Sequence, residues 1–226
     1  MKFQIFSNFD ENLSTMKKYM VLLCAIMMVF SSCHKYNTNN SNNENNDDNN
    51  QGGNDVPAYS IGECYKNQGI VFQINSGGAH GLIVSLDEDR LAWCVESQLS
   101  TNTYATNASD GWNNANSIVT KPNWKESFPA MAWAVNKNSN YTNGQIQSKQ
   151  WYLPAKNELR NLILNQEKVN QALTSLGYPT LKNKTYWSST EISAKYAFSE
   201  QENHGEMALC DSLKTYQHYV RAIKSF

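Results

Sequence analysis

Three cysteines and three histidines in residues 57–226 are the side chains best suited to act as nucleophile, base or metal ligand: Cys64, Cys94, Cys210, His80, His204 and His218. A thiol nucleophile needs an adjacent base, and zinc sites use short spacings such as C-x-x-C or H-E-x-x-H. None of these residues lies at such a spacing, and the carboxylates form no pattern typical of acid–base catalysis. We therefore predict that the chain is not an enzyme and that it binds no metal and no other cofactor.

The elements that must position these residues begin with strands. Apolar, β-branched runs at 69–74 and 81–86 flank a turn and predict a hairpin, and 91–95 predicts a third strand. Residues 149–154 predict another strand, which ends at a proline. The C-terminal part of the chain predicts four more strands, at 186–191, 195–199, 206–210 and 218–223.

Three segments predict helices. Asp110 is a suitable N-cap for a helix at 112–119, and Pro129 suits the first turn of a helix at 128–136. From 155 to 176 apolar residues recur at helical spacing, and Gly177 is a suitable C-cap. Because the strands and helices do not alternate regularly, we predict an α+β fold rather than a repeated βαβ fold.

The N-terminal region predicts export. Lys17 and Lys18 precede an apolar run at 19–30, which is the layout of a secretory signal. The run is shorter than the about 20 residues of a membrane span. We assign residues 1–32 to this signal and expect translation to begin at Met16, because residues 1–15 lack signal character.

Cys33 follows two serines, and the segment 30–33 resembles a bacterial lipobox, although Phe30 departs from the usual aliphatic residue. The resemblance implies that Cys33 becomes a lipidated N-terminus, which anchors the protein in the membrane. An ordinary signal cleaved near Ser32 is the alternative. Residues 33–56 have no apolar period and are rich in asparagine, which predicts a disordered tether. We expect an outer membrane lipoprotein, with its periplasmic or surface face undecided.

An exported protein matures in an oxidising compartment, where disulfides form. Because residues 57–226 hold three cysteines, pairing within them leaves at least one thiol outside a disulfide. Cys64 with Cys94, or Cys64 with Cys210, is a candidate disulfide between strands of the β core. The alternative is three buried thiols that act as small apolar side chains.

Five phrases of the sequence resemble one family: 65–72 (YKNQGIVF), 80–84 (HGLIV), 151–159 (WYLPAKNEL), 186–191 (YWSSTE) and 220–223 (VRAI). They are similar to the C-terminal domain of collagen-like Lcl proteins and to the major paralogous domain lipoproteins of Bacteroidota. The resemblance spans about residues 59–226. It implies a C-type-lectin-like fold over residues 57–226, with a mixed, mainly antiparallel sheet and two to three helices.

For most of these phrases the resemblance implies a scaffold role. We expect Trp151, Leu153 and Trp187 in the core and an ion pair of Arg221 with Glu158 or Glu191. Ser188 and Ser189 are suited to turns and to hydrogen bonds with the backbone. The formylglycine-generating enzymes are distant relatives that use a pair of cysteines near the end of the chain. This sequence has Cys210 alone there, which argues against that activity.

Related variable proteins of diversity-generating retroelements carry their diversified binding face in the segment that corresponds to 192–219. Aromatic and polar side chains suit an adaptable binding surface. The candidates here are Tyr196, Phe198, Glu200, Glu202, His204, Lys214, Tyr216 and His218. The alternative is an ordinary solvated loop with half-buried strands, and the sequence does not show whether this segment is diversified.

Residues 97–127 are a second candidate, in which rings could stack on sugars: Tyr104, Trp112, Asn113 and Trp124. The segment 112–114 (WNN) resembles one triplet of calcium-dependent lectins. The Glu/Gln-Pro-Asn/Asp triplet of those lectins is absent from this sequence, so we expect no calcium-dependent binding.

A net charge of −1 gives no basic surface for nucleic acid. We hypothesise a lipid-anchored, non-catalytic binding or adhesion module of the cell envelope that recognises a glycan or a protein through its loops. The alternatives are a structural or assembly subunit of an envelope or fimbrial complex, and a retroelement-diversified receptor.

Overall fold

The computed structural model describes residues 58–139, 141, 144–148, 150–181, 184–203 and 206–226, and it describes the backbone alone at 202, 203 and 206–209. Residues 1–57 lie outside this part. The predicted signal at 1–32, the lipidation of Cys33 and the tether at 33–56 therefore stay predictions.

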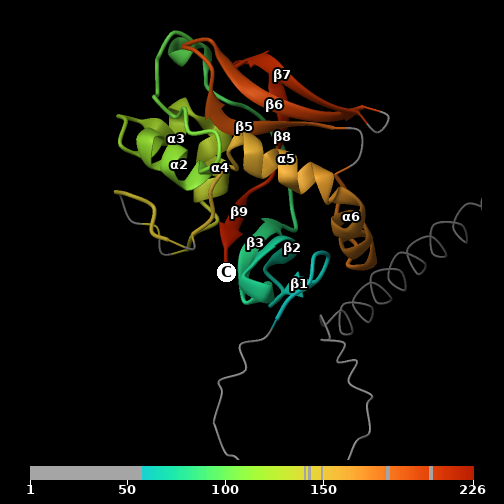
Figure 1. Ribbon diagram of the computed structural model, residues 1–226. Helices are drawn as coiled ribbons and strands as arrows, with labels where there is room; N and C mark the ends of the chain where they lie inside the picture. Colours follow the sequence, from blue (N-terminus) through green and yellow to red (C-terminus); the bar gives the residue numbers. More distant parts are fainter. Residues whose placement is uncertain (1–57, 140, 142–143, 149, 182–183, 204–205) are drawn as a thin grey trace, which may run out of the picture. The chain divides into compact units, whose positions relative to one another are not determined.

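The first sheet forms from both ends of the described chain (Figure 1). Its strands follow the order β1 (Cys64–Tyr65), β2 (Gly69–Asn75), β3 (His80–Ser85), β9 (Ile223–Ser225), and all are antiparallel. The predicted hairpin of β2 and β3 is confirmed. Gly81 allows its close approach, because a Cβ there would lie 2.1 Å from the carbonyl oxygen of Gln73.

The second sheet holds most of the C-terminal part of the chain. Its strands follow the order β4 (Asp89–Ala92), β8 (Gln217–Val220), β5 (Thr185–Glu191), β6 (Tyr196–Asn203), β7 (Glu206–Leu213). The pairings are antiparallel, apart from the single pairing of Tyr186 with Tyr219 between β5 and β8. Ser188 and Ser189 lie buried in β5 and not in a turn. The predicted backbone hydrogen bonding is confirmed for Ser188, whose hydroxyl donates to the carbonyl of Phe198 at 2.8 Å.

The described residues hold five α-helical segments, where we expected two or three: α2 (Gly111–Val119), α3 (Trp124–Ser127), α4 (Pro129–Val135), α5 (Lys156–Leu164) and α6 (Gln166–Ser175). The predicted N-cap is confirmed, since the Asp110 carboxylate accepts the backbone N–H of Asn113 at 3.0 Å. The predicted long helix is divided at Asn165, whose backbone leaves the helical conformation with φ −99° and ψ 9°. The α+β fold class is confirmed.

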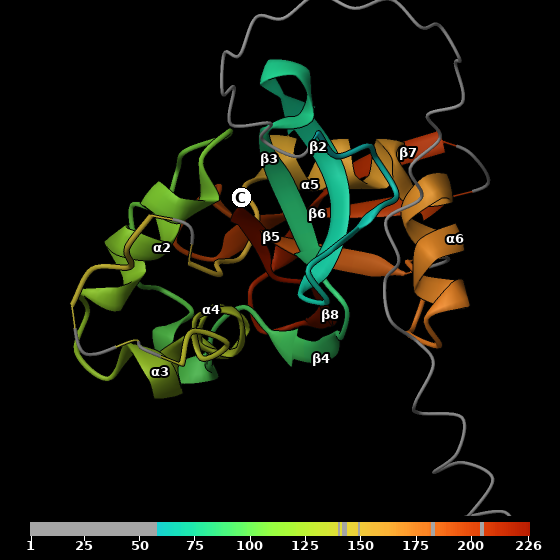
Figure 2. The same cartoon turned by 90° about the horizontal axis from the view of Figure 1, so that it is seen from below.

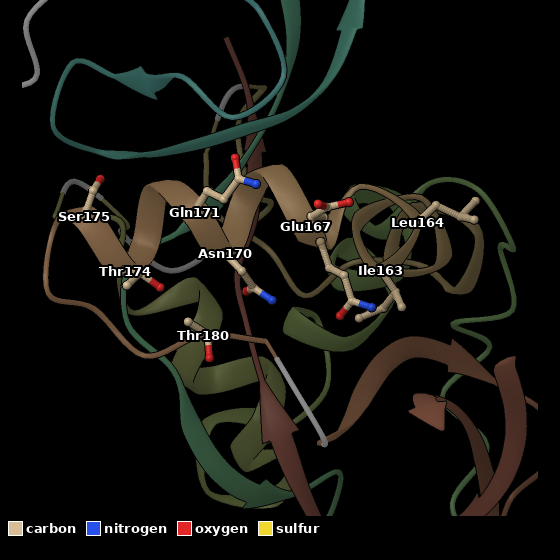
Figure 3. A pocket seen from close by; sticks show the side chains of 9 residues that line it. Ile163, Leu164, Glu167, Asn170, Gln171, Thr174, Ser175 and Thr180 are labelled. Carbon is tan, nitrogen blue, oxygen red and sulfur yellow. The ribbon is translucent and has the colours of Figure 1, made fainter. Parts of the chain in front are cut away.

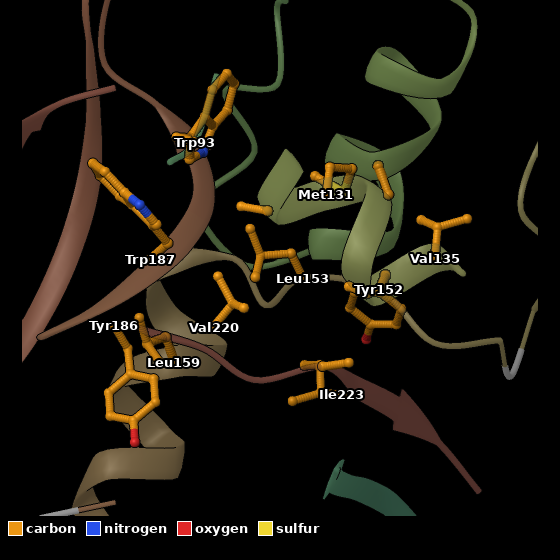
Figure 4. Packing of buried hydrophobic residues seen from close by; sticks show 14 of the residues in the cluster. Trp93, Met131, Val135, Tyr152, Leu153, Leu159, Tyr186, Trp187, Val220 and Ile223 are labelled. Atoms are coloured by element: carbon orange, nitrogen blue, oxygen red, sulfur yellow. The ribbon is translucent and has the colours of Figure 1, made fainter. Parts of the chain in front are cut away.

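Helices α2 to α4 lie on one side of β2 and β3, and α6 lies on the other side (Figure 2). Buried side chains from both sheets and from the helices make the larger of two apolar clusters, which includes Trp93, Leu153, Trp187, Val220 and Ile223 (Figure 4). The predicted core positions of Leu153 and Trp187 are therefore confirmed, whereas Trp151 is only partly buried.

Two predictions about the connection between the sheets are wrong. Of the strand predicted at 149–154, the described residues 150–154 form only an isolated bridge, from Tyr152 to Ile223. Arg221 pairs neither with Glu158 nor with Glu191. Its guanidinium is buried against the Glu88 carboxylate at 3.1 Å, and it also donates to the carbonyl of Ser85 at 2.8 Å.

Candidate functional site

A buried ion pair lies at the end of the second sheet. Glu191 is the last residue of β5, and Lys214 follows the last residue of β7. Their side chains form a salt bridge and are almost fully buried. The ammonium group of Lys214 also donates to the carbonyl of Ala194 at 2.9 Å and lies 4.5 Å from the ring centre of Trp93. Lys214 is therefore a buried residue with a structural role, and not the ligand-binding residue on the surface that the sequence predicted.

The Glu191 carboxylate also binds the backbone of a loop. This loop follows β4 and the short helical turn η2 (Glu96–Gln98) in the sequence. The carboxylate accepts the backbone N–H groups of Thr103 at 3.0 Å and Tyr104 at 2.9 Å. The backbone N–H of Glu191 donates to the carbonyl of Ala105 at 2.7 Å. Tyr104 has a φ of 62°, a left-handed conformation that a non-glycine residue adopts only when its surroundings hold it.

Four residues whose backbones lie close to this ion pair carry large, exposed apolar side chains. Tyr104, Ile192, Tyr196 and Tyr216 have exposed fractions of 74%, 36%, 43% and 59%. Ile192 donates its backbone N–H to the carbonyl of Tyr196, and Tyr196 lies opposite Leu213 across β6 and β7. Tyr216 donates its backbone N–H to the carbonyl of Leu213 at 2.9 Å. We call these four residues the tyrosine-rich surface.

The structure thus brings together parts of the two predicted candidate regions. Tyr104 comes from residues 97–127, and Tyr196 and Tyr216 come from residues 192–219. Sequence reasoning missed Glu191 as the residue that joins them, because its partners Thr103 and Lys214 lie far away in the sequence. It also missed Ile192, which no local pattern distinguishes from a buried strand residue.

The two predicted tryptophans differ in their exposure. Trp124 is 7% exposed and packs edge-to-face against Tyr141 with ring centres 5.8 Å apart. Trp112 is partly buried, and its indole N–H donates to the carbonyl of Ile146 at 2.8 Å. Asn113 is exposed on α2. The prediction of stacking on Trp124 is therefore wrong, because its ring is buried in packing, while stacking on Trp112 stays a prediction.

Phe198 and Glu200 lie against α5 rather than in a binding loop. The Lys156 ammonium lies 4.3 Å from the ring centre of Phe198. Glu200 is fully buried, and neither of its carboxyl oxygens has a hydrogen-bond partner. Burial raises the pKa of Glu200, and the positive charge of Arg160 partly opposes this rise. The predicted ligand role of Glu200 is therefore wrong for the folded domain.

His218 is also part of the packing. Its ring lies 4.5 Å from that of Trp187, and its Nε2 is 3.1 Å from the hydroxyl of Ser212. Burial lowers the pKa of His218, and the charge of Arg90 lowers it further. The side chain of Glu202 and the whole of His204 lie outside the described residues, so their predicted roles stay predictions.

The predicted disulfide of Cys64 with Cys94 is not formed, because Cys94 is a buried thiol. Cys64 is disulfide-bonded and Cys210 lies on β7 of the other sheet, so the predicted pairing of Cys64 with Cys210 stays a prediction. Burial raises the pKa of the Cys94 thiol to about 11. A thiol that stays protonated at neutral pH is a poor nucleophile, which fits the alternative in which Cys94 acts as a small apolar side chain.

Within the described ranges, no three His, Cys, Asp or Glu side chains gather closely enough to hold a metal ion. In the same residues, no helix has the length and apolar character to cross a membrane.

No protein family model matches the chain, and no curated protein does. Among solved structures, the chain is similar to a fimbrial protein from Bacteroides ovatus ATCC 8483, with a TM-score of 0.52 and 18% sequence identity. The similarity covers 76% of this chain and 46% of that protein, so this chain spans less than half of the length of the fimbrial protein. At this level of identity the similarity shows the fold alone.

Proposed function

We propose that the protein is a non-catalytic subunit of the cell envelope that contacts a protein partner through the tyrosine-rich surface, in an assembly or adhesion role. The observation that carries the proposal is that backbone hydrogen bonds join the segments of four residues with large, exposed side chains, three tyrosines and an isoleucine, to the segments that form a buried ion pair. Tyrosine side chains on a rigid backbone give a large contact area and lose little side-chain entropy on binding.

The shared fold with a fimbrial protein supports the assembly role over the glycan-binding role that the tryptophans suggested. The resemblance to Lcl and Bacteroidota lipoproteins supports a lipid anchor at Cys33 and a place at the outer membrane. The C-type-lectin-like fold belongs to the same proposal. Its phrases at 186–191 and 220–223 fall on buried residues of β5, β8 and β9, as a scaffold requires.

The test uses the full chain in its host cell, with Tyr104, Tyr196 and Tyr216 changed together to Ser. Exposed side chains contribute little to stability, within about 0.5 kcal/mol each, so this variant should fold. We expect it to lose co-purification with the envelope proteins that the unchanged chain retains after crosslinking. Tyr178→Ser, which removes an exposed tyrosine outside the surface, is the matched control. Equal co-purification by the triple variant and the control would contradict the proposal.

A further inference from the structure

A cleft lies along α6, and no residue of the tyrosine-rich surface lines it. Its wall consists of the end of α5, one side of α6 and the loop that follows α6. The lining is rich in side-chain amides and hydroxyls, and Ile163 and Leu164 add an apolar part. Asn170 extends from α6 on the same side as Ile163 and Thr174, and Thr180 lies across from it (Figure 3).

Asn170 has a fixed orientation in this cleft. Its residue is 6% exposed, and its Oδ1 accepts the backbone N–H of Leu181 at 2.7 Å. Since an N–H donor must face the oxygen of the amide, this bond assigns the two ends of the side chain. The Nδ2 group is consequently the free end, and it is buried with no hydrogen-bond partner.

A second unpartnered group lies one helical turn away. The Oε1 of Gln166 is buried without a hydrogen-bond partner, and Gln166 lines the same cleft. Residues four apart on a helix are neighbours on one face, with Cβ atoms about 5–6 Å apart. A buried donor and a buried acceptor without partners therefore belong to the same face of α6, and leaving such groups unsatisfied destabilises the folded protein.

We propose that this cleft binds a saccharide that carries an acetamido group. The carbonyl of the acetamido group accepts from Nδ2 of Asn170, and its N–H donates to Oε1 of Gln166. The methyl group meets the apolar side of the cleft at Ile163. The hydroxyls of Thr174 and Thr180 offer further partners to the hydroxyls of the sugar ring.

The test measures binding of the full chain to chitotriose, a trisaccharide of N-acetylglucosamine, by calorimetry. Cellotriose has hydroxyls in place of the acetamido groups and is the matched ligand control. We expect chitotriose to bind about tenfold more tightly than cellotriose, since only the acetamido group supplies hydrogen-bond partners for the two buried amide groups. A second arm measures retention by purified peptidoglycan sacculi, which distinguishes a cell-wall source from a free oligosaccharide.

The variant that tests the geometry is Asn170→Asp. It keeps the oxygen that accepts from Leu181 but removes the Nδ2 donor, so chitotriose affinity should fall about tenfold. Asn113→Asp makes the same change at an exposed position on α2 and should bind as the unchanged chain does. Gln166→Met is a second variant, in case the buried aspartate disturbs folding, and it should also weaken binding.

Binding of neither chitotriose nor sacculi would overturn the proposal. Equal affinity of the Asn170→Asp and Asn113→Asp variants would overturn it as well, as would equal binding of the two trisaccharides. Preferential binding of trialanine, whose peptide groups also offer a carbonyl and an N–H, would assign the cleft to peptides instead. These outcomes leave the proposal for the tyrosine-rich surface untouched, because the two sites share no residue.

Discussion

Lys214 and Glu191 form a buried ion pair whose carboxylate also accepts the backbone N–H groups of Thr103 and Tyr104. One acidic side chain thus connects the end of β5, the turn after β7 and the loop after η2. Tyr104 has a left-handed backbone conformation, which a non-glycine residue keeps only when its surroundings hold it. The exposed position of its side chain therefore depends on this connection.

Lys214→Met should destabilise the domain strongly. The change leaves the Glu191 carboxylate buried without its cation, and breaking a buried pair in this way costs about 3–5 kcal/mol. Denaturant unfolding measures the loss. Lys137→Met is the control, because Lys137 pairs with an Asp87 that is 61% exposed, and such pairs contribute about 0–1 kcal/mol. Similar losses in the two variants would contradict the structural role of Lys214.

The pair can be tested further by combining Lys214→Met with Glu191→Gln. The double variant removes both charges, so its loss of stability should be smaller than the sum of the two single losses. Strict additivity of the two single losses would show that the charges do not interact.

The stability of the domain should depend on pH through Glu158. Burial raises its pKa to about 7, although its carboxylate accepts the backbone N–H groups of Ala155 and Gly111. Because the pKa in the folded state lies above the ordinary value of 4.5, the folded state binds more protons in this range. The free energy of unfolding therefore falls as pH rises from about 4.5 to about 7, by up to about 1.4 kcal/mol per unit.

Glu158→Gln should remove this part of the pH dependence, because the amide oxygen still accepts the N–H groups but does not ionise. Urea unfolding between pH 4.5 and pH 8 measures it in both proteins. Glu126→Gln, on the exposed side of α3, should leave the slope unchanged. An identical slope in the Glu158→Gln variant and the unchanged chain would contradict the assignment.

Glu200→Met should stabilise the domain at neutral pH. Both carboxyl oxygens of Glu200 are buried without partners, and a buried polar group without a hydrogen bond costs about 1–3 kcal/mol. Met has a similar shape and needs no partner. Burial raises the pKa of Glu200, so the gain should grow as pH rises above the ordinary range of a carboxyl. A lower midpoint of thermal unfolding for the variant at neutral pH would contradict this.

Trp124→Ala and Tyr104→Ala should differ in their effect on stability, because Trp124 is buried and Tyr104 is exposed. Trp124 is buried in the core, and removing a large buried aromatic costs about 3–5 kcal/mol. Tyr104 is exposed, so its replacement should change the free energy of unfolding by less than about 0.5 kcal/mol. Guanidinium unfolding measures both changes. A small loss for Trp124→Ala would restore its ring as a candidate for ligand stacking.

Local signals made part of the fold predictable. The hairpin of β2 and β3 follows from two apolar runs around a glycine-containing turn, and the N-cap role of Asp110 depends on residues three positions away. The division between α5 and α6 was missed because the apolar period continues through Asn165 without a Gly or Pro. The strand predicted at 149–154 failed because Tyr152 finds a partner in a single residue of β9.

The candidate site was less predictable, because its residues meet only after folding. Tyr104 was identified as an aromatic residue of the segment 97–127, and Tyr216 through the resemblance that singles out 192–219. The same reasoning placed the buried Trp124 and Lys214 on the surface. A lysine can be buried when folding brings a carboxylate that is remote in the sequence, such as Glu191, into contact with it. No pattern along the chain reveals such a pairing, and the same holds for the free amide groups of Gln166 and Asn170.

The most direct test of the proposed function places a photo-crosslinking benzoylphenylalanine at position 104 of the full chain in its host cell. We expect a covalent adduct between position 104 and an envelope protein, and we expect it to disappear when Tyr196 and Tyr216 are changed to Ser. The same amino acid at position 178 should give no such adduct. Adducts of equal amount at both positions, or none at position 104, would contradict a partner-binding role for the tyrosine-rich surface.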